Sequence, residues 1–348
     1  MNHTNYIQRC LQLAKNGIGT TRPNPSVGAV IVHKGKIIGE GFTSPYGGAH
    51  AEVNAIRAVK NKELLKEATI YVTLEPCAHF GKTPPCADLI IQHKIPNVVI
   101  GTIDTNSLVA GKGIERLKKS GCNVTVNILK EASIEHHKRF FTVQNQKRPY
   151  IILKWAETQD GLIAPSVKKE QTPIWISNVY SQQLVHKWRA EEHAILVGTN
   201  TVLADNPQLN VRSWHGKNPI RLVIDKSLQI SQEANVLDGS AKTIVFFDRK
   251  KATPPLKREG ITYKSIDFST EIITQIVAFL QEEKIQSLIV EGGTQTLQSF
   301  IDLNLWDEAR VFIGDVEFKN GIRKPRLKGK LKTRKNIVKD VLKIYTND

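Results

Sequence analysis

Cysteine is scarce in this chain of 348 residues, which has only Cys10, Cys77, Cys86 and Cys122. Four cysteines are too few for a disulfide-stapled secreted scaffold of this length. Long apolar runs are missing as well, because no segment approaches the roughly 18 apolar residues that span a bilayer. The first ten residues also lack the basic stretch and apolar run of a signal peptide. We therefore expect a cytoplasmic protein with no membrane partner, in which a close pair of cysteines indicates a metal site.

Acidic residues are in the minority, with 33 Asp and Glu against 49 Lys and Arg and a net charge of +16. The excess suits nucleic acid, a membrane surface or small phosphorylated molecules equally well. The densest basic run, residues 319–335, holds nine Lys or Arg and no acid. It has no aromatic residue that could stack on nucleic acid bases. We therefore expect a solvated loop there rather than a nucleic acid surface.

The length of the chain suits two domains of about 150 to 200 residues each. In the first half, strands are predicted at residues 27–32, 36–42, 69–74 and 97–101, with helical patterns near 7–14, 51–60 and 87–93. The alternation begins again after residues 144–148, with strands predicted at 149–155, 193–198, 220–225, 242–247 and 286–290 and a helix at 179–189. We therefore predict two different α/β domains, 1–145 and 146–348, the first with a β-hairpin over residues 27–42 and a mostly parallel sheet.

Four residues of the first half form a candidate metal centre. A catalytic zinc ion takes three protein ligands and leaves a fourth position for water, and His50, Cys77 and Cys86 supply that number. In a deamination reaction, the water then needs a base that passes its proton to the ring nitrogen of the substrate base and to the amine that leaves. Glu52 is the acidic residue adjacent to a ligand, and we predict this catalytic role for it.

The predicted local structure brings these side chains together. Residues two apart share a site only in the first turn of a helix, so we place His50 and Glu52 at a helix start. Cys86 is predicted in the first turn of another helix, with Thr83 as the cap and Pro84 at the first helical position. Cys77 follows the strand that ends at Leu74, where α/β sheets place their chemistry.

Each of these residues alone is more often a packing or loop residue, but the ordered set matches the signature of zinc-dependent deaminases. That signature usually has two residues between the cysteines, whereas eight intervene here. Two alternatives stay open on the residue types. One is a nucleic acid deaminase of the transfer-RNA type with an appended binding domain. The other is a zinc-stabilised binding protein without enzymatic activity, in which His79 closes the metal site as a fourth ligand.

Longer segments of the first half extend the metal motif. They are residues 24–28 (NPSVG), 50–53 (HAEV), 75–86 (EPCAHFGKTPPC), 104–106 (DTN) and 109–113 (VAGKG). In order and spacing they resemble the deaminase domain of bifunctional riboflavin biosynthesis proteins. The resemblance implies a cytidine-deaminase-like three-layer domain that removes the 2-amino group of 2,5-diamino-6-(5-phosphoribosylamino)pyrimidin-4(3H)-one to give 5-amino-6-(5-phosphoribosylamino)uracil. It also implies that five residues approach this small phosphorylated substrate, namely Asn24, His79, Lys82, Asp104 and Asn106.

The second half offers weaker evidence by itself. A strand at 286–290 runs into Glu291-Gly292-Gly293-Thr294, a glycine turn that suits a pyrophosphate but lacks the full dinucleotide-binding spacing. Further segments are 154–156 (KWA), 158–161 (TQDG), 175–177 (WIS) and 201–207 (TVLADNP), with Arg189, Leu209 and Arg212 at matching positions. Together they resemble the reductase domain of the same bifunctional family. The resemblance implies a dihydrofolate-reductase-like fold in which NADPH reduces the ribosyl group of the uracil compound to ribityl.

The same resemblance assigns two sets of residues in the second half. Cofactor contacts are expected from Ala156, Trp175, Thr201, Asp205, Gly293, Thr294, Gln295, Thr296, Leu297, Gln298 and Ser299. Substrate contacts are expected from Lys154, Pro173, Arg189, Leu209, Arg212 and Glu291, although the family commonly has serine where Pro173 stands. Lys226 follows a predicted strand and is either a ligand of the coenzyme 2′-phosphate or an exposed solubilising lysine. Lys154 and Asp205 are candidate proton donors, and we expect a homo-oligomer with no nucleic acid partner.

Overall fold

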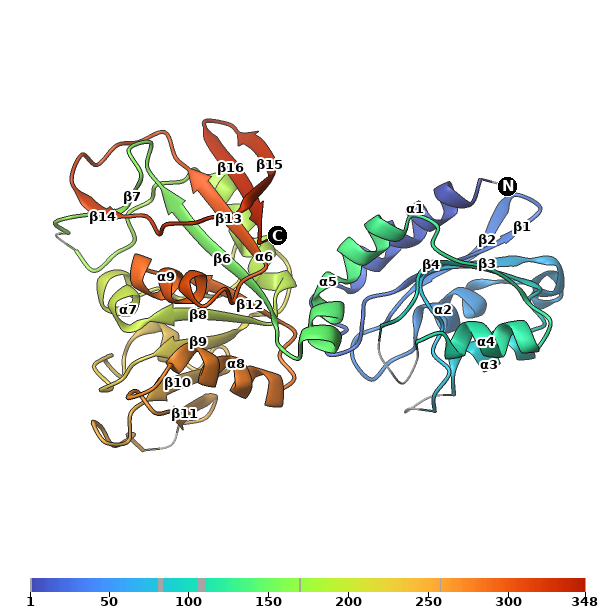
Figure 1. Ribbon diagram of the computed structural model, residues 1–348, viewed down its shortest axis with the longest axis horizontal. Coiled ribbons are helices and arrows are strands. Elements are labelled where there is room, and N and C mark those ends of the chain that lie inside the picture. Colours follow the sequence, from blue (N-terminus) through green and yellow to red (C-terminus); the bar gives the residue numbers. More distant parts are fainter. Residues whose placement is uncertain (1, 81–83, 106–109, 169, 257, 348) are drawn as a thin grey trace. The chain divides into compact units, whose positions relative to one another are not determined.

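The computed structural model describes residues 2–80, 84–105, 110–168, 170–256 and 258–347 (Figure 1). The chain divides after Lys147 into two compact units, residues 1–147 and 148–348, and each is described by itself. Among the described residues, no helix is both long and apolar enough to cross a membrane.

The first unit is built on a five-stranded sheet of order β2-β1-β3-β4-β5. Its strands are β1 (Gly28–His33), β2 (Lys36–Phe42), β3 (Thr69–Leu74), β4 (Asn97–Thr102) and β5 (Asn123–Thr125). The prediction of a mostly parallel sheet is wrong for this unit, because β1 pairs antiparallel with both β2 and β3 and only β3, β4 and β5 are parallel. The reversal comes from a tight hairpin at Lys34 and Gly35, whose φ angles of 47° and 79° suit a two-residue turn.

Helices cover both faces of this sheet (Figure 1). They are α1 (His3–Ala14), α2 (Ala51–Ala58), α3 (Cys86–Gln92), α4 (Lys112–Lys119) and α5 (Lys130–Gln146), with short 3-10 turns at Lys15–Gly17 and Lys62–Glu67. Successive strand side chains point to opposite faces. Val30 and Tyr71 therefore pack with Ile7 of α1, while Ile31 and Ile70 pack with the helices of the other face. The sheet is thus buried on both sides in a three-layer arrangement.

The second unit contains a nine-stranded sheet of order β11-β10-β9-β8-β12-β6-β13-β16-β15. Its strands are β6 (Tyr150–Glu157), β8 (Ala194–Gly198), β9 (Ile220–Ile224), β10 (Thr243–Phe247), β11 (Ile261–Ser265), β12 (Ser287–Glu291), β13 (Glu308–Ile313), β15 (Lys330–Ile337) and β16 (Asp340–Thr346). The pairs from β11 through β13 are parallel, and β16 and β15 continue the sheet antiparallel. The predicted alternation of strands and helices is confirmed here.

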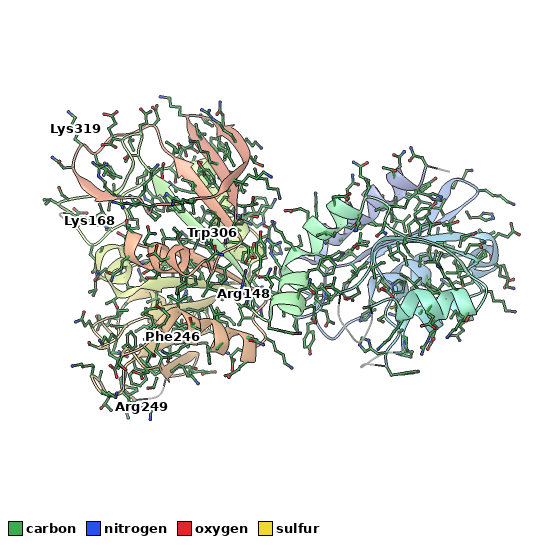
Figure 2. The ribbon with its side chains drawn as sticks, in the orientation of Figure 1. Arg148, Lys168, Phe246, Arg249, Trp306 and Lys319 are labelled. Atoms are coloured by element: carbon green, nitrogen blue, oxygen red, sulfur yellow. The ribbon has the colours of Figure 1, made fainter. Side chains whose placement is uncertain are left out.

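Four helices flank the large sheet: α6 (Val179–Glu191), α7 (Thr199–Asp205), α8 (Ile272–Glu282) and α9 (Thr294–Asp302), with a 3-10 turn η3 (Asn235–Leu237). Trp306 and Phe246 are buried with α8 and α9 on one face, whereas Trp188 of α6 packs on the other. The labelled Lys168, Arg249 and Lys319 lie at the periphery of the unit (Figure 2).

The basic run 319–335 is not a loop throughout, so that expectation is wrong in part. It contains β14 (Gly321–Arg323), which pairs with β7 (Leu162–Pro165), and most of the edge strand β15. The side chains of β15 are nevertheless exposed along nearly the whole strand. Exposed lysines on an edge strand discourage pairing with a further strand, which explains how a run of this charge lies in a sheet.

Candidate active sites

Three potential zinc ligands converge beyond the carboxyl end of β3. His50 Nδ1 lies 3.3 Å from Cys86 Sγ and 3.8 Å from Cys77 Sγ, and the three ligand atoms all lie within 4.8 Å of one another. A tetrahedral zinc ion with ordinary bond lengths requires N···S separations of about 3.6 Å. The side chains therefore fit a zinc ion without rearrangement.

The backbone explains why these residues meet. His50 is the N-cap of α2 and Glu52 lies in its first turn, as predicted. Cys77 follows the end of β3, and the backbone N–H of Cys86 donates to Cys77 Sγ over 3.3 Å. The segment that follows β3 is thereby fixed to the start of α3, nine positions later.

Cys86 is the first residue of α3, so its predicted place in a first turn is confirmed, but the predicted cap is wrong. Pro85, not Thr83, is the N-cap, and Pro84 lies outside the helix. A residue that precedes proline is pushed out of the helical region, and Pro84 precedes Pro85. Thr83 lies outside the described residues.

Burial and mutual contacts shift the titration of this group. Burial raises the pKa of Glu52, and the charge of the nearby Cys77 raises it further. The contact with Cys86 lowers the pKa of Cys77 to about 4, while the contact with Cys77 raises the pKa of His50. A buried carboxyl with a raised pKa beside the three potential ligands has the character of a group that can both accept and return a proton.

Glu75 is a residue that the sequence did not single out, although it stands two positions before Cys77. Its buried carboxylate accepts from the backbone N–H groups of Asp104 (3.3 Å), Gly111 (3.0 Å), Gly113 (2.9 Å) and Ile114 (3.2 Å). Gly113 lies so close to the chain that an added Cβ would meet the carbonyl oxygen of Pro76 at 2.0 Å. Glu75 therefore ties the segment that carries Asp104 to the segment that carries Cys77.

The predicted deaminase substrate residues are only partly brought together. Asp104 is buried at the end of β4, and Asn24 lies in a turn before β1, where its N–H donates to the carbonyl of Thr21. His79 is exposed and does not belong to the ligand group formed among the described residues. Lys82 and Asn106 lie outside the described residues.

Two adjacent histidines of α5, which no sequence motif marks, support the segment that follows Asn24 and strand β3. His136 Nε2 donates to the carbonyl of Ser26 over 2.8 Å, and His137 Nε2 lies 3.1 Å from Thr73 Oγ1. Burial lowers the pKa of His136 to about 4 and lowers the pKa of His137 as well. Both rings are therefore neutral at physiological pH and act as hydrogen-bonding supports.

The second unit contains a buried charged cluster. Arg189 Nη2 donates to Glu291 Oε2 over 2.9 Å, and Lys154 Nζ lies 3.8 Å from the same oxygen. Adjacent parallel strands explain the proximity, because Glu291 of β12 is in register with Lys154 of β6. Although burial alone would raise the pKa of Glu291, the charges of Arg189 and Lys154 lower it. Burial lowers the pKa of Lys154.

Arg212 lies close to this cluster, on a loop that follows α7. The main chain of the loop is held by α6, because His186 Nδ1 lies 3.0 Å from the carbonyl of Asn210 and Arg189 Nη1 donates to the same oxygen over 3.4 Å. Burial lowers the pKa of His186 to about 4, and the charges of Arg189 and Arg212 act in the same direction. Leu209 is buried in the core. Four of the predicted substrate residues, Lys154, Arg189, Arg212 and Glu291, thus belong to one connected group.

The predicted cofactor residues of the glycine turn lie at the start of a helix. Gly293 is the N-cap of α9, and its N–H donates to Thr201 Oγ1 of α7 over 3.2 Å. The side chain of Leu297 is wholly buried in the core. Leu297 can therefore contact a ligand only through its backbone. The hydrogen bond between Gly293 and Thr201 therefore brings the N-termini of α7 and α9 next to each other.

The remaining predicted residues are more scattered. Asp205 forms an ion pair with Lys168, and Lys226 Nζ lies 5.6 Å from the centre of the Phe268 ring. Ala156 lies in β6, while Trp175 and Pro173 are exposed in a segment without regular structure. A cavity of about 930 Å³ opens beside α9, and Thr294, Gln298, Arg323 and Lys324 are among the residues that line it.

Both halves of the chain match known protein families. Residues 1–102 match the cytidine and deoxycytidylate deaminase zinc-binding region, and residues 149–316 match the RibD C-terminal domain. The riboflavin biosynthesis protein RibD of Aquifex aeolicus is 42% identical over 312 residues, which cover 89% of this chain and 86% of that protein. RibD of Escherichia coli is 35% identical over 324 residues, covering 88% of this chain and 86% of that protein.

Solved structures agree over the whole chain. A deaminase and reductase of Thermotoga maritima, which acts on diaminohydroxyphosphoribosylaminopyrimidine and 5-amino-6-(5-phosphoribosylamino)uracil, has a TM-score of 0.89 at 35% identity and covers 99% of this chain and 98% of that one. Acinetobacter baumannii RibD has a TM-score of 0.86 at 30% identity with the same coverage. The predicted fold classes are confirmed, and the alternative of an appended nucleic acid binding domain is wrong.

Proposed function

This chain belongs to the RibD family of riboflavin biosynthesis proteins, which combine a deaminase with a reductase, and we propose that it acts on the pyrimidines of that family. The first reaction would replace the 2-amino group of 2,5-diamino-6-(5-phosphoribosylamino)pyrimidin-4(3H)-one by oxygen. The second would reduce the ribosyl group of the resulting 5-amino-6-(5-phosphoribosylamino)uracil to ribityl with NADPH. The observation that carries the first assignment is the His50, Cys77 and Cys86 group with Glu52 buried beside it.

The deaminase step is assigned to residues 1–145, with His50, Cys77 and Cys86 as the zinc ligands. A bound zinc ion lowers the pKa of water to near neutrality. Glu52 would take a proton from the attacking water and deliver it to the ring nitrogen next to C2, and would then carry the proton of the added hydroxyl group to the leaving amine as the carbonyl forms. One water is consumed and one ammonia is released. Asn24, His79, Lys82, Asp104 and Asn106 are proposed to hold the substrate.

Zinc removal should separate the two activities. We expect a chelator that strips zinc to abolish ammonia release, and added Zn²⁺ to restore it, because the ligand group lies in the first unit alone. NADPH oxidation with the uracil substrate should stay within about twofold, since the reductase residues contain no such ligand set among those described. Zinc content is followed by elemental analysis alongside both rates. Ammonia release that persists in zinc-free protein would contradict the assignment.

The reductase step is assigned to residues 146–348. Ala156, Trp175, Thr201, Asp205 and the run Gly293–Ser299 are proposed to bind NADPH, which supplies the hydride. The N-terminus of α9 and the Thr201 contact with Gly293 support this proposal, because exposed N–H groups at helix starts suit a pyrophosphate. Lys226 is proposed as the partner of the coenzyme 2′-phosphate, and Lys154 and Asp205 stay candidates for the proton donor.

The substrate phosphate is assigned to Arg189 and Arg212. A guanidinium group offers two parallel donors to phosphate oxygens, and the hydrogen bond from Arg189 Nη2 to Glu291 holds the Arg189 side chain in place. Lys154, Pro173 and Leu209 complete the proposed substrate contacts. A homo-oligomer in the cytoplasm stays a prediction.

A further inference from the structure

The loop of residues 206–212 contains one residue, Leu209, in a backbone conformation that its type does not favour. Asn206 has a φ angle of 41° and Leu209 a φ angle of 51°. Asparagine tolerates the left-handed region at a helix end, whereas the region is costly for leucine, which gains no local hydrogen bond there. Leu209 is nevertheless 2% exposed and packs in the core. Contacts from outside the loop must therefore hold it in this shape.

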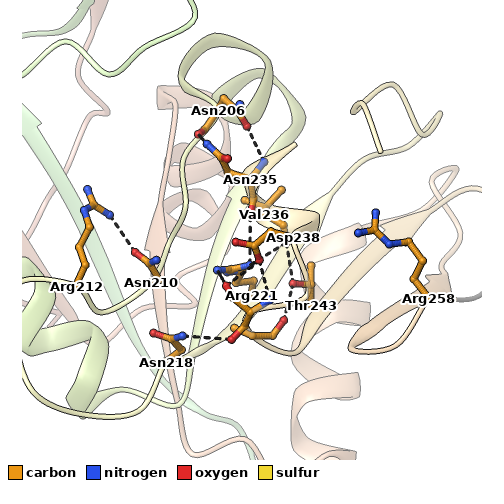
Figure 3. A network of polar contacts seen from close by, with 12 residues as sticks. Asn206, Asn210, Arg212, Asn218, Arg221, Asn235, Val236, Asp238, Thr243 and Arg258 are labelled. Carbon is orange, nitrogen blue, oxygen red and sulfur yellow. Dashed lines mark hydrogen bonds and ion pairs between the residues drawn. The ribbon is translucent and has the colours of Figure 1, made fainter. Parts of the chain in front are cut away.

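Asn235 holds the beginning of the loop. Its backbone N–H donates to Asn206 Oδ1 over 2.8 Å, and its side-chain Nδ2 donates to the carbonyl of Asn206 over 2.7 Å (Figure 3). The two bonds satisfy both the side chain and the main chain of the left-handed residue. Asn206 is thereby fixed at the point where the chain leaves α7.

Asn218 holds the end of the loop. Its Oδ1 accepts from the backbone N–H of Val211 over 2.8 Å, and its Nδ2 donates to the carbonyl of Ser240 over 3.4 Å. Arg212 follows Val211 directly, and its Nη1 donates to Asn210 Oδ1 over 3.0 Å (Figure 3). The bond from Asn218 therefore fixes the main chain immediately before the guanidinium proposed to bind phosphate.

Asn235 and Ser240, the residue that Asn218 contacts, belong to one segment, residues 235–240. Arg221 holds this segment together. Its side chain is wholly buried and donates to the carbonyls of Asn235 and Val236 (each 3.3 Å), to Asp238 Oδ1 (2.7 Å) and to Ser240 Oγ (2.8 Å). Figure 3 shows this fan of contacts around one guanidinium. Because β9 carries Arg221 within the sheet, the segment is anchored to the core.

We propose that Asn218 and Asn235 are positioning residues, which use the segment organised by Arg221 to hold the loop in the shape that presents Arg212 to the substrate phosphate. The inference rests on the proposed reductase function and adds to it the origin of the phosphate site's geometry. The two arginines of that site are coupled through Asn210, whose carbonyl accepts from Arg189 while its side chain accepts from Arg212.

The test compares variants in the full-length protein with the phosphorylated uracil substrate and with its dephosphorylated form. Asn218 is exposed, so Asn218→Ala should fold normally. We expect its KM for the phosphorylated substrate to rise about threefold to tenfold, the effect of one neutral hydrogen bond, with kcat and the Kd for NADPH within about twofold. Asn235→Ala should behave in the same way. KM for the dephosphorylated substrate should change little in either variant.

A matched control and a double variant distinguish positioning from a general structural role. Asn320→Ala removes an exposed amide of the same unit for which the described structure records no side-chain hydrogen bond, and it should leave every constant unchanged. If Asn218 acts through Arg212, adding Asn218→Ala to Arg212→Ala should raise KM by less than about 1.5-fold, since residues that act together are not additive.

Four outcomes would overturn the inference. Equal losses on both substrates would make the amides general supports of the fold. A full Asn218→Ala effect in the Arg212→Ala background would show that Asn218 acts without Arg212. If Arg212→Ala raises KM but Asn218→Ala and Asn235→Ala each keep the wild-type KM, the loop needs neither amide. A wild-type KM in Arg212→Ala itself would instead remove the phosphate role of Arg212 from the proposed function, and the inference with it.

Discussion

Glu52→Gln should reduce ammonia release by about 10²- to 10⁴-fold, the range that general acid–base catalysis contributes. The amide keeps the size of the carboxyl but cannot take a proton from water and return it to the amine. Glu52 is 4% exposed, so a base from solvent cannot easily reach its position and replace it. Burial also raises the pKa of Glu52. The rate is measured as ammonia released from the diaminopyrimidine substrate at saturating concentration.

The variant also separates a proton shuttle from a ligand. Because His50, Cys77 and Cys86 remain, Glu52→Gln should retain about one zinc ion per chain. Reduction of separately supplied uracil substrate by NADPH should be unchanged, which serves as the internal control for folding. Loss of zinc from the variant, or ammonia release close to that of the wild type, would remove Glu52 from the proposed role.

Arg212→Ala and Arg189→Ala should each lower kcat/KM of the reductase about tenfold to a hundredfold. The estimate follows from the loss of a charge-assisted hydrogen bond to phosphate, which contributes roughly 1.5 to 3 kcal/mol. Arg212 is exposed and is the cleaner probe. Arg189→Ala also leaves the buried carboxylate of Glu291 without its closest partner, so thermal unfolding must be recorded for that variant. Deamination should not change in either case.

The dephosphorylated substrate decides what the two arginines recognise. It should be poor for the wild type and become little worse in the variants, because the interaction that they remove is already absent. If both variants impair the phosphorylated and the dephosphorylated substrates by equal factors, the arginines do not bind the phosphate. The substrate would then lie differently in the site.

Local sequence patterns predicted that His50, Cys77 and Cys86 lie together, because short segments encode the position of each residue. A strand that ends at Leu74, a following Pro76-Cys77 and a helix that starts near Cys86 are each visible in the sequence. The start of α3 was misplaced by two residues because two consecutive prolines precede it. The helix α5 was not predicted, since its mean hydropathy is low and its buried residues are mixed with polar ones.

Contacts between distant segments were beyond the reach of the sequence. Glu75 binds backbone groups up to 39 positions away, and no residue type marks an N–H group as a partner. In the sequence, Arg221 is only a charged residue within an apolar strand. Its role depends on hydrogen bonds to residues 235–240, which the sequence does not predict. The antiparallel pairing of β1 with β3 depends in the same way on tertiary packing.

We propose that this one chain carries a zinc-dependent deaminase and an NADPH-dependent reductase that act in sequence. The most direct test supplies a single zinc-loaded sample with the diaminopyrimidine substrate, first without NADPH and then with it. We predict one ammonia per substrate and no ribityl product in the first stage. In the second stage, one NADPH should be oxidised per ribityl product formed. Ribityl product or NADPH oxidation without prior ammonia release, or ammonia release followed by no NADPH oxidation, would contradict the account.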